Sequence, residues 1–366
     1  MFGPVPHDVL MLPTSLSIGP YTLPHPLGLA PMAGITDAPF RQVCQAWGAA
    51  WTVGEMISSD ISLLKTQKTA QRIAGLQCLP LTLISADEPA TSAPNIIQIA
   101  GTKPAQLVEA AQFYVDLGAD IIDINMGCPA KKICKVAAGS ALMQDETSVE
   151  QILNAVCQAV KVPVTLKTRL GWDEAHCNVM TIARLAEQAG IAALAVHGRT
   201  RADAYRGQAR YDLIALVKQQ LHIPVIANGD VTSATKAQAV LQQTNADGLL
   251  VGRASQGQPW LFTQWRTPVH AVLNKANVLR TVDYHLQTAY DFYGPQRAVK
   301  IMRKHLQHYF KQLLGPDAQT AFRQISQLTD ADQQYITSLK LLQSLPDDLF
   351  NTVPDTQVSA GMAQAA

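Results

Sequence analysis

Eight short apolar runs, separated by helical stretches, dominate the chain between residues 27 and 254. Each run is nearly continuous in apolar residues, as strands buried on both faces are. The runs cover 27–34, 49–56, 95–101, 119–127, 162–170, 192–200, 223–230 and 246–254. Segments such as 104–118 and 179–190 lie between them, with apolar positions at helical spacing and a closing glycine. This alternation favours parallel strands joined by helices.

The number of β–α units predicts an α/β fold. Eight units in roughly 230 residues fit a (β/α)8 TIM barrel in size and count. A doubly wound sheet is the alternative, but it favours a glycine-rich loop after its first strand. No GxGxxG occurs in the chain. We therefore expect a TIM barrel followed by a smaller all-α C-terminal domain.

The domain boundaries follow changes in this pattern. A chain of 366 residues holds one large and one smaller domain. From residue 270 to 345 the pattern is helical and mildly basic, with nine Lys/Arg against five Asp/Glu. We expect an extension at 1–17, a catalytic barrel at 18–265, a helical domain at 276–345 and a disordered tail at 346–366. Residues 72–94 form an unusually long connection.

Composition limits the class of protein. The net charge is only +1, so it indicates no general attraction to nucleic acid or membrane. The six cysteines contain no CxxC pair, which argues against a metal site and favours a reduced, cytoplasmic protein. The first 26 residues contain six prolines and no Lys or Arg, unlike a signal peptide. No apolar run is long enough to cross a bilayer.

Polar residues follow most of the predicted strands. In a TIM barrel the chemistry is carried at the C-terminal ends of the strands. These positions hold Gln98, Asn125, Cys128, Lys167, Arg169, His197, Arg199, Asn228, Asp230 and Arg253. Lys167 and His197 each interrupt an apolar strand, and a buried lysine needs an electron-rich partner. The pattern predicts a site at this end of the barrel.

The last two strands favour a phosphorylated cofactor. Many such barrels bind phosphate there, where glycine backbone approaches an anion closely. "NGD" (228–230) and "VGRA" (251–254) supply glycines, and Arg253 adds a planar fork. Gln98, Lys167 and the backbone of the first strand suit an isoalloxazine ring. Pyridoxal phosphate on Lys167 remains open from the residues alone.

Several of these stretches resemble the flavin-dependent tRNA-dihydrouridine synthases, most closely the bacterial B-type subfamily. The matching motifs include "LAPMAGITDAPFR" (29–41), "DINMGCPAKKI" (123–133), "VHGRTR" (196–201), "IPVIANGD" (223–230) and "VGRASQGQPWLF" (251–262). The resemblance extends from residue 18 to 306.

The resemblance implies an FMN-bearing barrel, NADPH as reductant and a helical tRNA-binding domain. Cys128 becomes the active-site acid. The implied FMN contacts are Pro31, Met32, Ala33, Gln98, Lys167, His197, Asn228, Gly229, Asp230, Gly252 and Arg253.

The chemistry of uracil explains the cysteine. Reduced flavin delivers hydride to C6, and C5 must then receive a proton from an acid on the opposite face. The Cys128 thiol must be protonated at that moment, so a strongly lowered pKa would be counterproductive.

The target base must also be flipped out of folded RNA, which predicts a basic site mouth. The expected substrate-binding residues are Asn125, Lys131, Lys132, Arg199, Arg201, Arg297, Lys300, Arg303 and Lys304. Three of these cations, Arg297, Lys300 and Lys304, are spaced to share one face of a helix.

Two further functions compete with this prediction. One is a small-pyrimidine reductase of the dihydroorotate dehydrogenase type, against which the basic helical part argues. The other is an RNA-binding protein that keeps the barrel as a scaffold, against which Cys128, Lys167 and His197 argue. We expect a monomer that modifies a D-loop uridine.

Overall fold

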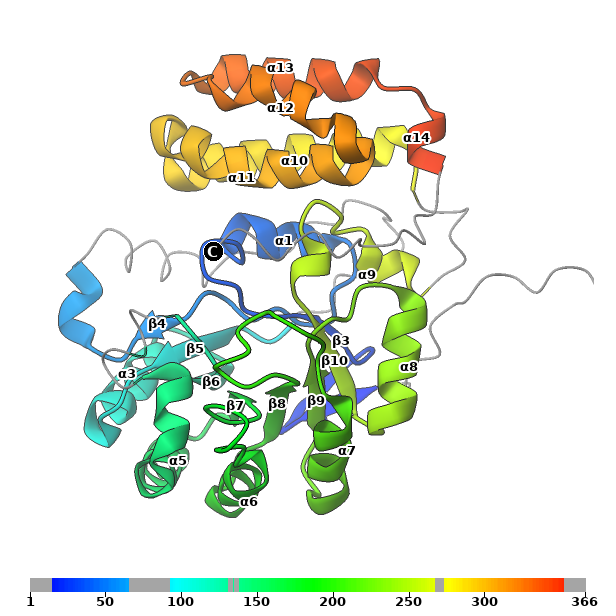
Figure 1. Cartoon of the computed structure of the whole chain (residues 1–366). Helices are drawn as coiled ribbons and strands as arrows, with labels where there is room; N and C mark the ends of the chain where they lie inside the picture. Colours follow the sequence, from blue (N-terminus) through cyan, green and yellow to red (C-terminus); the bar gives the residue numbers. More distant parts are fainter. Residues whose placement is uncertain (1–14, 66–92, 131–133, 135–137, 267–272, 352–366) are drawn as a thin grey trace, which may run out of the picture.

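A curled parallel sheet with helices outside it forms the lower part of the molecule in Figure 1. The computed structural model describes residues 15–65, 93–130, 134, 138–266 and 273–351. Neighbouring strands follow the order β3-β10-β9-β8-β7-β6-β5-β4. The strands are β3 (Leu27–Leu29), β4 (Ile57–Ser58), β5 (Ile96–Ala100), β6 (Ile121–Met126), β7 (Val164–Arg169), β8 (Ala193–His197), β9 (Val225–Asn228) and β10 (Gly248–Val251). The predicted TIM barrel is confirmed.

The second predicted strand, 49–56, differs most from expectation. It pairs only through isolated parallel bridges, from Thr52 to Leu29 and from Val53 to Ile96. The Leu29 N–H donates to the Trp51 carbonyl at 3.0 Å, and the Val53 N–H donates to the Leu29 carbonyl at 3.2 Å. These bonds join the two edges of the sheet and close the barrel. Regular pairing resumes only beyond the predicted run, in β4.

Three of the helices that cover the barrel begin at a side-chain cap. The Asp37 carboxylate accepts the Phe40 N–H at the start of α1, and Asp145 and Ser233 cap two others in the same way. Gly190 ends one helix in the left-handed conformation. The covering helices are α1 (Ala38–Ala46), α3 (Pro104–Asp116), α5 (Glu146–Ala159), α6 (Val179–Ala189), α7 (Tyr211–Gln220) and α8 (Ala234–Thr244). Shorter turns are η1 (Ile61–Lys65), η3 (Gly139–Gln144), η4 (Arg253–Ser255) and α9 (Leu261–Gln264).

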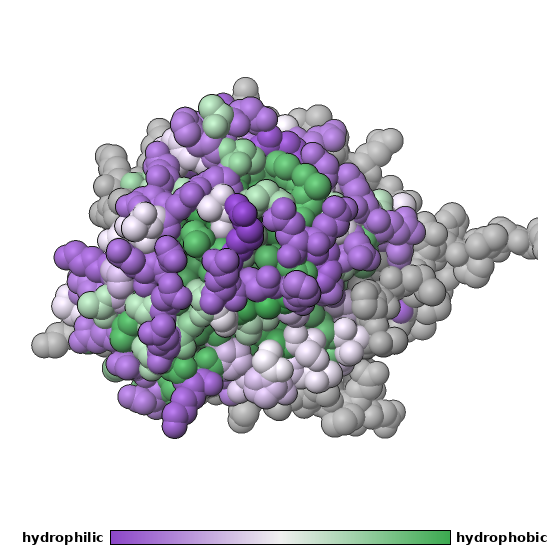
Figure 2. Space-filling model, turned by 90° about the horizontal axis from the view of Figure 1, so that it is seen from below, coloured by the Kyte–Doolittle hydropathy of each residue, from purple (hydrophilic) through white to green (hydrophobic). Residues whose placement is uncertain are grey.

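A small hairpin covers the N-terminal end of the barrel. β1 (Leu16–Ile18) pairs antiparallel with β2 (Tyr21–Leu23), and its apolar side chains are buried with Trp51 and Leu250. The expected extension at 1–17 therefore reaches too far, because Leu16 already belongs to the folded unit. Residues 1–14 lie outside the described part of the chain. Seen from below, hydrophilic residues cover most of the outer surface, and hydrophobic ones show nearer the middle (Figure 2).

The C-terminal helices form a second layer above α1 (Figure 1). They are α10 (Lys275–Tyr293), α11 (Pro295–Leu314), the turn η6 (Gly315–Asp317), α12 (Ala318–Ser326), α13 (Ala331–Ser344) and α14 (Asp348–Asn351). Their apolar faces share one core, in which Trp47 of α1 also packs. Indole Nε1 of Trp47 donates to Oγ1 of Thr281 at 2.9 Å, so this core joins the helices to the barrel.

The predicted boundary at residue 345 is too early. α14 lies beyond it, and Phe350 is buried in the helical core, so the apolar anchor was missed in a four-residue helix with little periodicity. Residues 352–366, and 72–92 of the long connection, lie outside the described residues. Within the described ranges, no helix combines the length and apolar character that a membrane span needs.

Gly28 provides a test of barrel closure. A Cβ at this position would lie 2.3 Å from Cε2 of Trp51, whose side chain is almost fully buried. We expect Gly28→Ala to lower the free energy of unfolding by about 1–3 kcal/mol, because the indole ring must move. Denaturant unfolding of Gly54→Ala is the control, since the nearest atom there, Cζ of Arg41, is 3.5 Å away. Equal losses in both variants would contradict the packing argument.

Candidate active site

The parallel register gathers the polar residues of neighbouring strands at one end of the barrel. Residues that face each other across two strands lie at the same height. The facing pairs are Gln98 with Asp123, Asn125 with Lys167, Arg169 with His197, and His197 with Asn228. The predicted clustering of strand-end side chains is therefore present in the structure.

A buried carboxylate, Asp123, organises the centre of this cluster. Its Oδ2 accepts Nε2 of Gln98 at 2.7 Å, and its Oδ1 accepts Oγ1 of Thr165 at 2.7 Å. Burial raises the pKa of Asp123, while these two hydrogen bonds and the nearby Lys167 act in the opposite direction. No role was predicted for Asp123, although an acidic residue within an apolar strand was a visible signal.

The same chain of hydrogen bonds holds the loop that carries Cys128. Oε1 of Gln98 accepts Nδ2 of Asn125 at 2.7 Å. Oδ1 of Asn125 then accepts the N–H groups of Gly127 and Cys128 at 3.2 and 3.0 Å. From the other side, Nε of Arg169 donates to the Gly127 carbonyl at 2.7 Å. Asn125, predicted to bind substrate, is thus occupied in positioning the cysteine loop.

The Cys128 thiol lies half-buried just beyond β6. The backbone carbonyl of Cys128 accepts hydrogen bonds from the Ser140 hydroxyl at 2.9 Å and from the Ser140 N–H at 3.2 Å. Burial raises the pKa of the thiol above the usual value of a cysteine, and the Ala130 N–H, Arg169 and Lys167 only partly oppose this. The thiol is therefore protonated at neutral pH and can act as an acid.

Lys167 of β7 and His197 of β8 lie on neighbouring strands. The two side chains differ in charge. Nζ of Lys167 donates to Oδ1 of Asn228 at 2.9 Å, and burial lowers the pKa of Lys167 to about 8. Burial and the surrounding cations hold the pKa of His197 well below its usual value, so the ring is neutral. Nδ1 of His197 is buried and has no hydrogen-bond partner among the described residues. A ligand that pairs with this nitrogen would remove a free-energy cost.

The ends of β9 and β10 form the cationic side of the site. Gly229 and Asp230 both adopt positive φ, at 114° and 49°. The Asp230 carboxylate accepts both terminal nitrogens of Arg199, at 2.8 and 2.6 Å, and also Nη2 of Arg253 at 3.2 Å. Gly252 is open on its Cβ side, with Sδ of Met32 nearest at 3.7 Å. This open backbone beside an exposed guanidinium suits a phosphate.

The loop after β3 completes the ring of predicted cofactor contacts. The Met32 N–H donates to Oγ1 of Thr36 at 2.9 Å, which fixes the turn at Pro31–Ala33. Nε2 of Gln256 lies 3.4 Å from Sδ of Met32. The Met32 side chain therefore lies near the end of β10. The residues present can therefore hold a flat, phosphorylated cofactor between β3, β7 and β10.

Tyr205 is a site residue that the sequence analysis missed. Its ring is 53% exposed, and the Cζ atoms of Arg253 and Arg169 lie 4.9 and 5.6 Å from its centroid. It also meets the His197 ring edge-on at 6.4 Å. An aromatic residue close after "HGRTR" was the available signal. An exposed ring between two cations offers a stacking surface at the mouth.

The predicted substrate-binding cations do not all lie together. Arg199 is 2% exposed and forms an ion pair with Asp230, so its guanidinium is buried and is not a free cation at the mouth. Arg201 stacks its guanidinium on Trp172, 4.3 Å from the ring centroid. Arg303 donates to the Leu328 carbonyl at 2.7 Å, within the helical domain. Lys131 and Lys132 lie outside the described residues.

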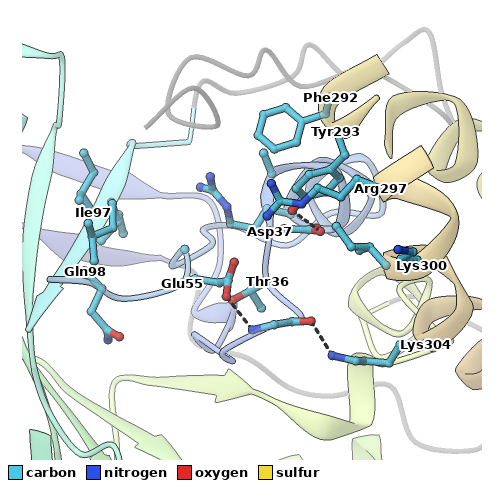
Figure 3. A pocket seen from close by; sticks show the side chains of 17 residues that line it. Thr36, Asp37, Glu55, Ile97, Gln98, Phe292, Tyr293, Arg297, Lys300 and Lys304 are labelled. Atoms are coloured by element: carbon cyan, nitrogen blue, oxygen red, sulfur yellow. Dashed lines mark hydrogen bonds between the residues drawn. The ribbon is translucent and has the colours of Figure 1, made fainter. Parts of the chain in front are cut away.

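Arg297, Lys300 and Lys304 do converge, on a cavity between α11 and the barrel (Figure 3). This cavity has a volume of about 330 Å³, and its wall reaches Gln98 of β5. Nζ of Lys304 donates to the Gly34 carbonyl at 3.0 Å, directly after the turn of β3. The cavity therefore connects the basic helix with the strand-end cluster.

Comparison with known proteins places these features in context. The family model described as "Dihydrouridine synthase (Dus)" matches residues 28–346. The chain is 51% identical over 322 residues to tRNA-dihydrouridine synthase B of Pseudomonas aeruginosa, covering 87% of this chain and 92% of that protein. It is 44% identical over 330 residues to the protein of that name from Pasteurella multocida, covering 88% and 94%.

Solved structures agree on the fold. A morphinone reductase mutant in complex with tetrahydroNAD superposes with a TM-score of 0.51 at 14% identity, covering 72% of this chain and 91% of that one. Histamine dehydrogenase from Rhizobium superposes with a TM-score of 0.53 at 12% identity, covering 76% and 51%. At such identities the likeness shows the fold alone.

The raised thiol pKa gives a test that needs no substrate. Iodoacetamide reacts with the thiolate, so labelling of Cys128 should rise with pH along a curve whose midpoint lies above that of an exposed cysteine. A cysteine in a short peptide, with a pKa of about 8.5, is the reference. Peptide mass spectrometry measures both rates. A midpoint near neutral pH would contradict an acid that stays protonated.

Proposed function

The chain belongs to the dihydrouridine synthase family and is a tRNA-dihydrouridine synthase, and we propose that it reduces the C5=C6 bond of a D-loop uridine with FMN and Cys128. The position of the Cys128 thiol carries this proposal. It is half-buried and protonated at the end of β6, on a loop held by Asn125 and Arg169. Family membership also disfavours the dihydroorotate dehydrogenase and scaffold alternatives, together with pyridoxal phosphate on Lys167.

The proposed reaction needs one acid from the protein. When bound, reduced FMN supplies the hydride that C6 of the uracil receives. Cys128 gives its proton to C5, which completes the C5=C6 reduction and leaves a thiolate. Arg169 and Lys167 lie close enough to favour that thiolate electrostatically, which assists the transfer. Reprotonation of the thiolate from solvent prepares the next turnover.

The residues around the barrel mouth have separate proposed tasks in holding FMN. Lys167 and His197 face the ring system, Lys167 as a donor and His197 through its unpaired Nδ1. Arg253 and the backbone at Gly229 and Gly252 receive the phosphate. Asp230 keeps Arg253 in place from behind. The other proposed contacts are Pro31, Met32, Ala33, Gln98, Asn228 and Asp230.

Residues 276–345 are proposed to dock tRNA so that the target base enters the cavity below α11. Arg297 and Lys300 line this cavity on the helical side, and Tyr205, outside the cavity lining and beside Arg253, offers an exposed stacking ring on the barrel. The base must leave its stack to reach Cys128. We further propose NADPH as the reductant of FMN and a cytoplasmic monomer as the working form.

Cys128→Ala tests the acid directly. The variant should still purify as a yellow, flavin-loaded protein, because Cys128 makes no proposed cofactor contact. Dihydrouridine formation in unmodified tRNA should fall by roughly 10²–10⁴-fold, the usual contribution of a general acid. Mass spectrometry of digested tRNA measures the product.

The matched control is Cys157→Ala, a half-buried cysteine on α5. It should retain normal activity. Normal product formation by Cys128→Ala would exclude the assigned acid while leaving the family membership untouched.

The double variant Arg297→Ala/Lys300→Ala tests tRNA docking. Binding of tRNA should weaken, and the slope of log K against log salt should fall by roughly two, because two phosphate contacts are lost. Filter binding across a salt series gives the slope. Arg323→Ala/Lys340→Ala, exposed cations elsewhere in the helical domain, should leave it unchanged. A reversed ranking of the two double variants would contradict the proposed docking face.

A further inference from the structure

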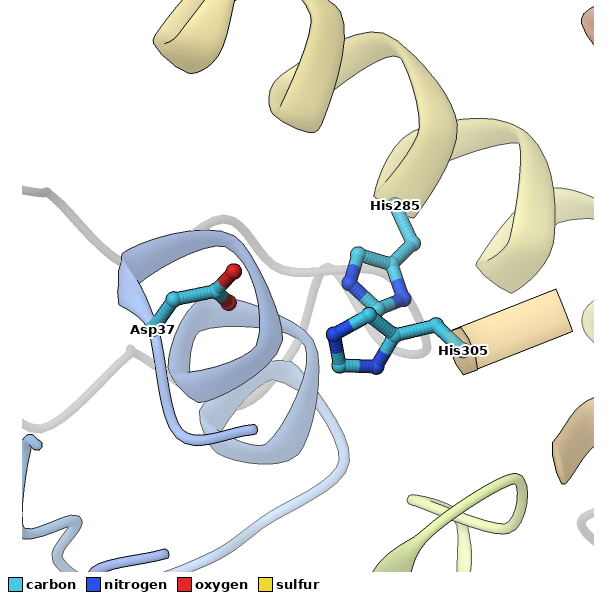
Figure 4. A group of neighbouring side chains, drawn as sticks. All are labelled: Asp37, His285 and His305. Carbon is cyan, nitrogen blue, oxygen red and sulfur yellow. The ribbon is translucent and has the colours of Figure 1, made fainter. Parts of the chain in front are cut away.

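Three buried ligand-type side chains meet where the barrel joins the helical domain. They are Asp37 at the start of α1, His285 of α10 and His305 of α11. One candidate ligand atom from each lies within 4.8 Å of the other two. Figure 4 shows both imidazole rings directed toward the Asp37 carboxylate. None of the three has a role in the proposed reduction of uridine.

The two histidines have free nitrogens inside this group. Nε2 of His285 and Nε2 of His305 are buried, and neither has a hydrogen-bond partner among the residues the structure describes. Nδ1 of His285 lies 3.1 Å from the Tyr309 hydroxyl, which can orient the ring and leave Nε2 available. A metal-bound histidine commonly has its other nitrogen held in this way. A common partner for these two buried ring nitrogens would remove the free-energy cost of leaving them unpaired.

Asp37 completes the donor set. Its Oδ1 accepts the Phe40 N–H at 3.0 Å, and its Oδ2 accepts the Tyr293 hydroxyl at 2.8 Å. Each carboxylate oxygen has a second lone pair, so neither bond prevents coordination. Phe40 packs against both imidazoles, with ring centroids 5.7 and 5.3 Å away, and shields the group from water.

We propose that Asp37, His285 and His305 bind a zinc ion that fastens the helical domain to the barrel. Two neutral imidazoles and one carboxylate are a ligand set that zinc accepts, whereas magnesium and calcium prefer oxygen ligands throughout. Zinc bonds of about 2.0–2.1 Å would bring the donor atoms to roughly 3.4 Å from one another. The present separations, which are within 4.8 Å, would therefore have to shorten by up to about 1.4 Å, through rotation of the side chains.

The surroundings are compatible with a cation. Burial is the main cause that raises the pKa of Asp37 to about 6; Glu55 raises it further and adds a second negative charge, while Arg41 acts on Asp37 in the opposite sense. Lys304 is the cation that faces His305. These four charged groups balance formally, and Arg297 and Lys300 of the same cavity add positive charge further out. Asp37 also lines the 330 Å³ cavity, which gives the ion a route from solvent.

The proposed ion would act on architecture and not on the chemistry at Cys128. It would tie the segment after the β3 turn to both α10 and α11, beside the bond from Lys304 to Gly34. A substrate that docks on the helices would then lie in a fixed position relative to this barrel loop. Residues 37, 285 and 305 are too far apart in sequence for any motif spacing to reveal such a site.

Metal content of the full-length protein tests the proposal without any activity measurement. The chain is expressed with added zinc, purified without chelator and analysed by inductively coupled plasma mass spectrometry. We expect about one zinc ion per chain. The zinc content of Asp37→Asn should be lower by at least about tenfold. This variant should remain folded, because asparagine caps a helix as well as aspartate. His305→Ala should also lose zinc, and His308→Ala, three residues further along α11, should keep it.

Crystallography of the same preparation supplies the second measurement. An anomalous peak at the zinc edge between the three side chains supports the proposal. The proposal is overturned if the native protein does not bind stoichiometric Zn²⁺, or if Asp37→Asn binds as much Zn²⁺ as the native protein. It is also overturned if a water molecule bridges the two Nε2 atoms. Both outcomes are independent of flavin content and of tRNA modification.

Discussion

The buried carboxylate of Asp123 is the constraint on which the strand-end site depends. A carboxylate inside a barrel must be paired, and Gln98 and Thr165 provide the two donors. Because one end of the Gln98 amide is fixed in this way, its oxygen is aimed at Asn125. Asn125 in turn receives the N–H of Cys128. The position of the thiol is thus set by a chain of bonds that begins at a residue away from the chemistry.

The barrel and the helical domain form one working unit. Trp47 of α1 packs in the helical core and bonds to Thr281, while Tyr293 bonds to Asp37. These contacts place the basic face of α11 over the cavity that opens toward Gln98. A substrate held by the helices would therefore meet the barrel mouth in a defined orientation, which a flexible link between the domains could not ensure.

Sequence-based prediction was more accurate for elements with a local pattern than for features that depend on residues elsewhere in the chain. The buried strands were predictable because each is a short apolar run closed by polar residues. The irregular pairing of the predicted strand at 49–56 and the helix at 348–351 were not, because both depend on partners elsewhere in the chain, Leu29 for the first and the helical core for the second. Arg199 looked like a surface cation after a strand, yet its burial against Asp230 could not be read from the motif.

By itself, the sequence determined the eight-unit barrel, its family and the cysteine at the end of the fourth unit, since these follow from local periodicity and contiguous motifs. Only the tertiary structure decided which cations face the cavity and which are paired inside, because that choice depends on the rotation of each helix against its neighbours. It also decided that Asp37, His285 and His305 meet. Contacts between residues hundreds of positions apart arise from packing, and no local pattern records them.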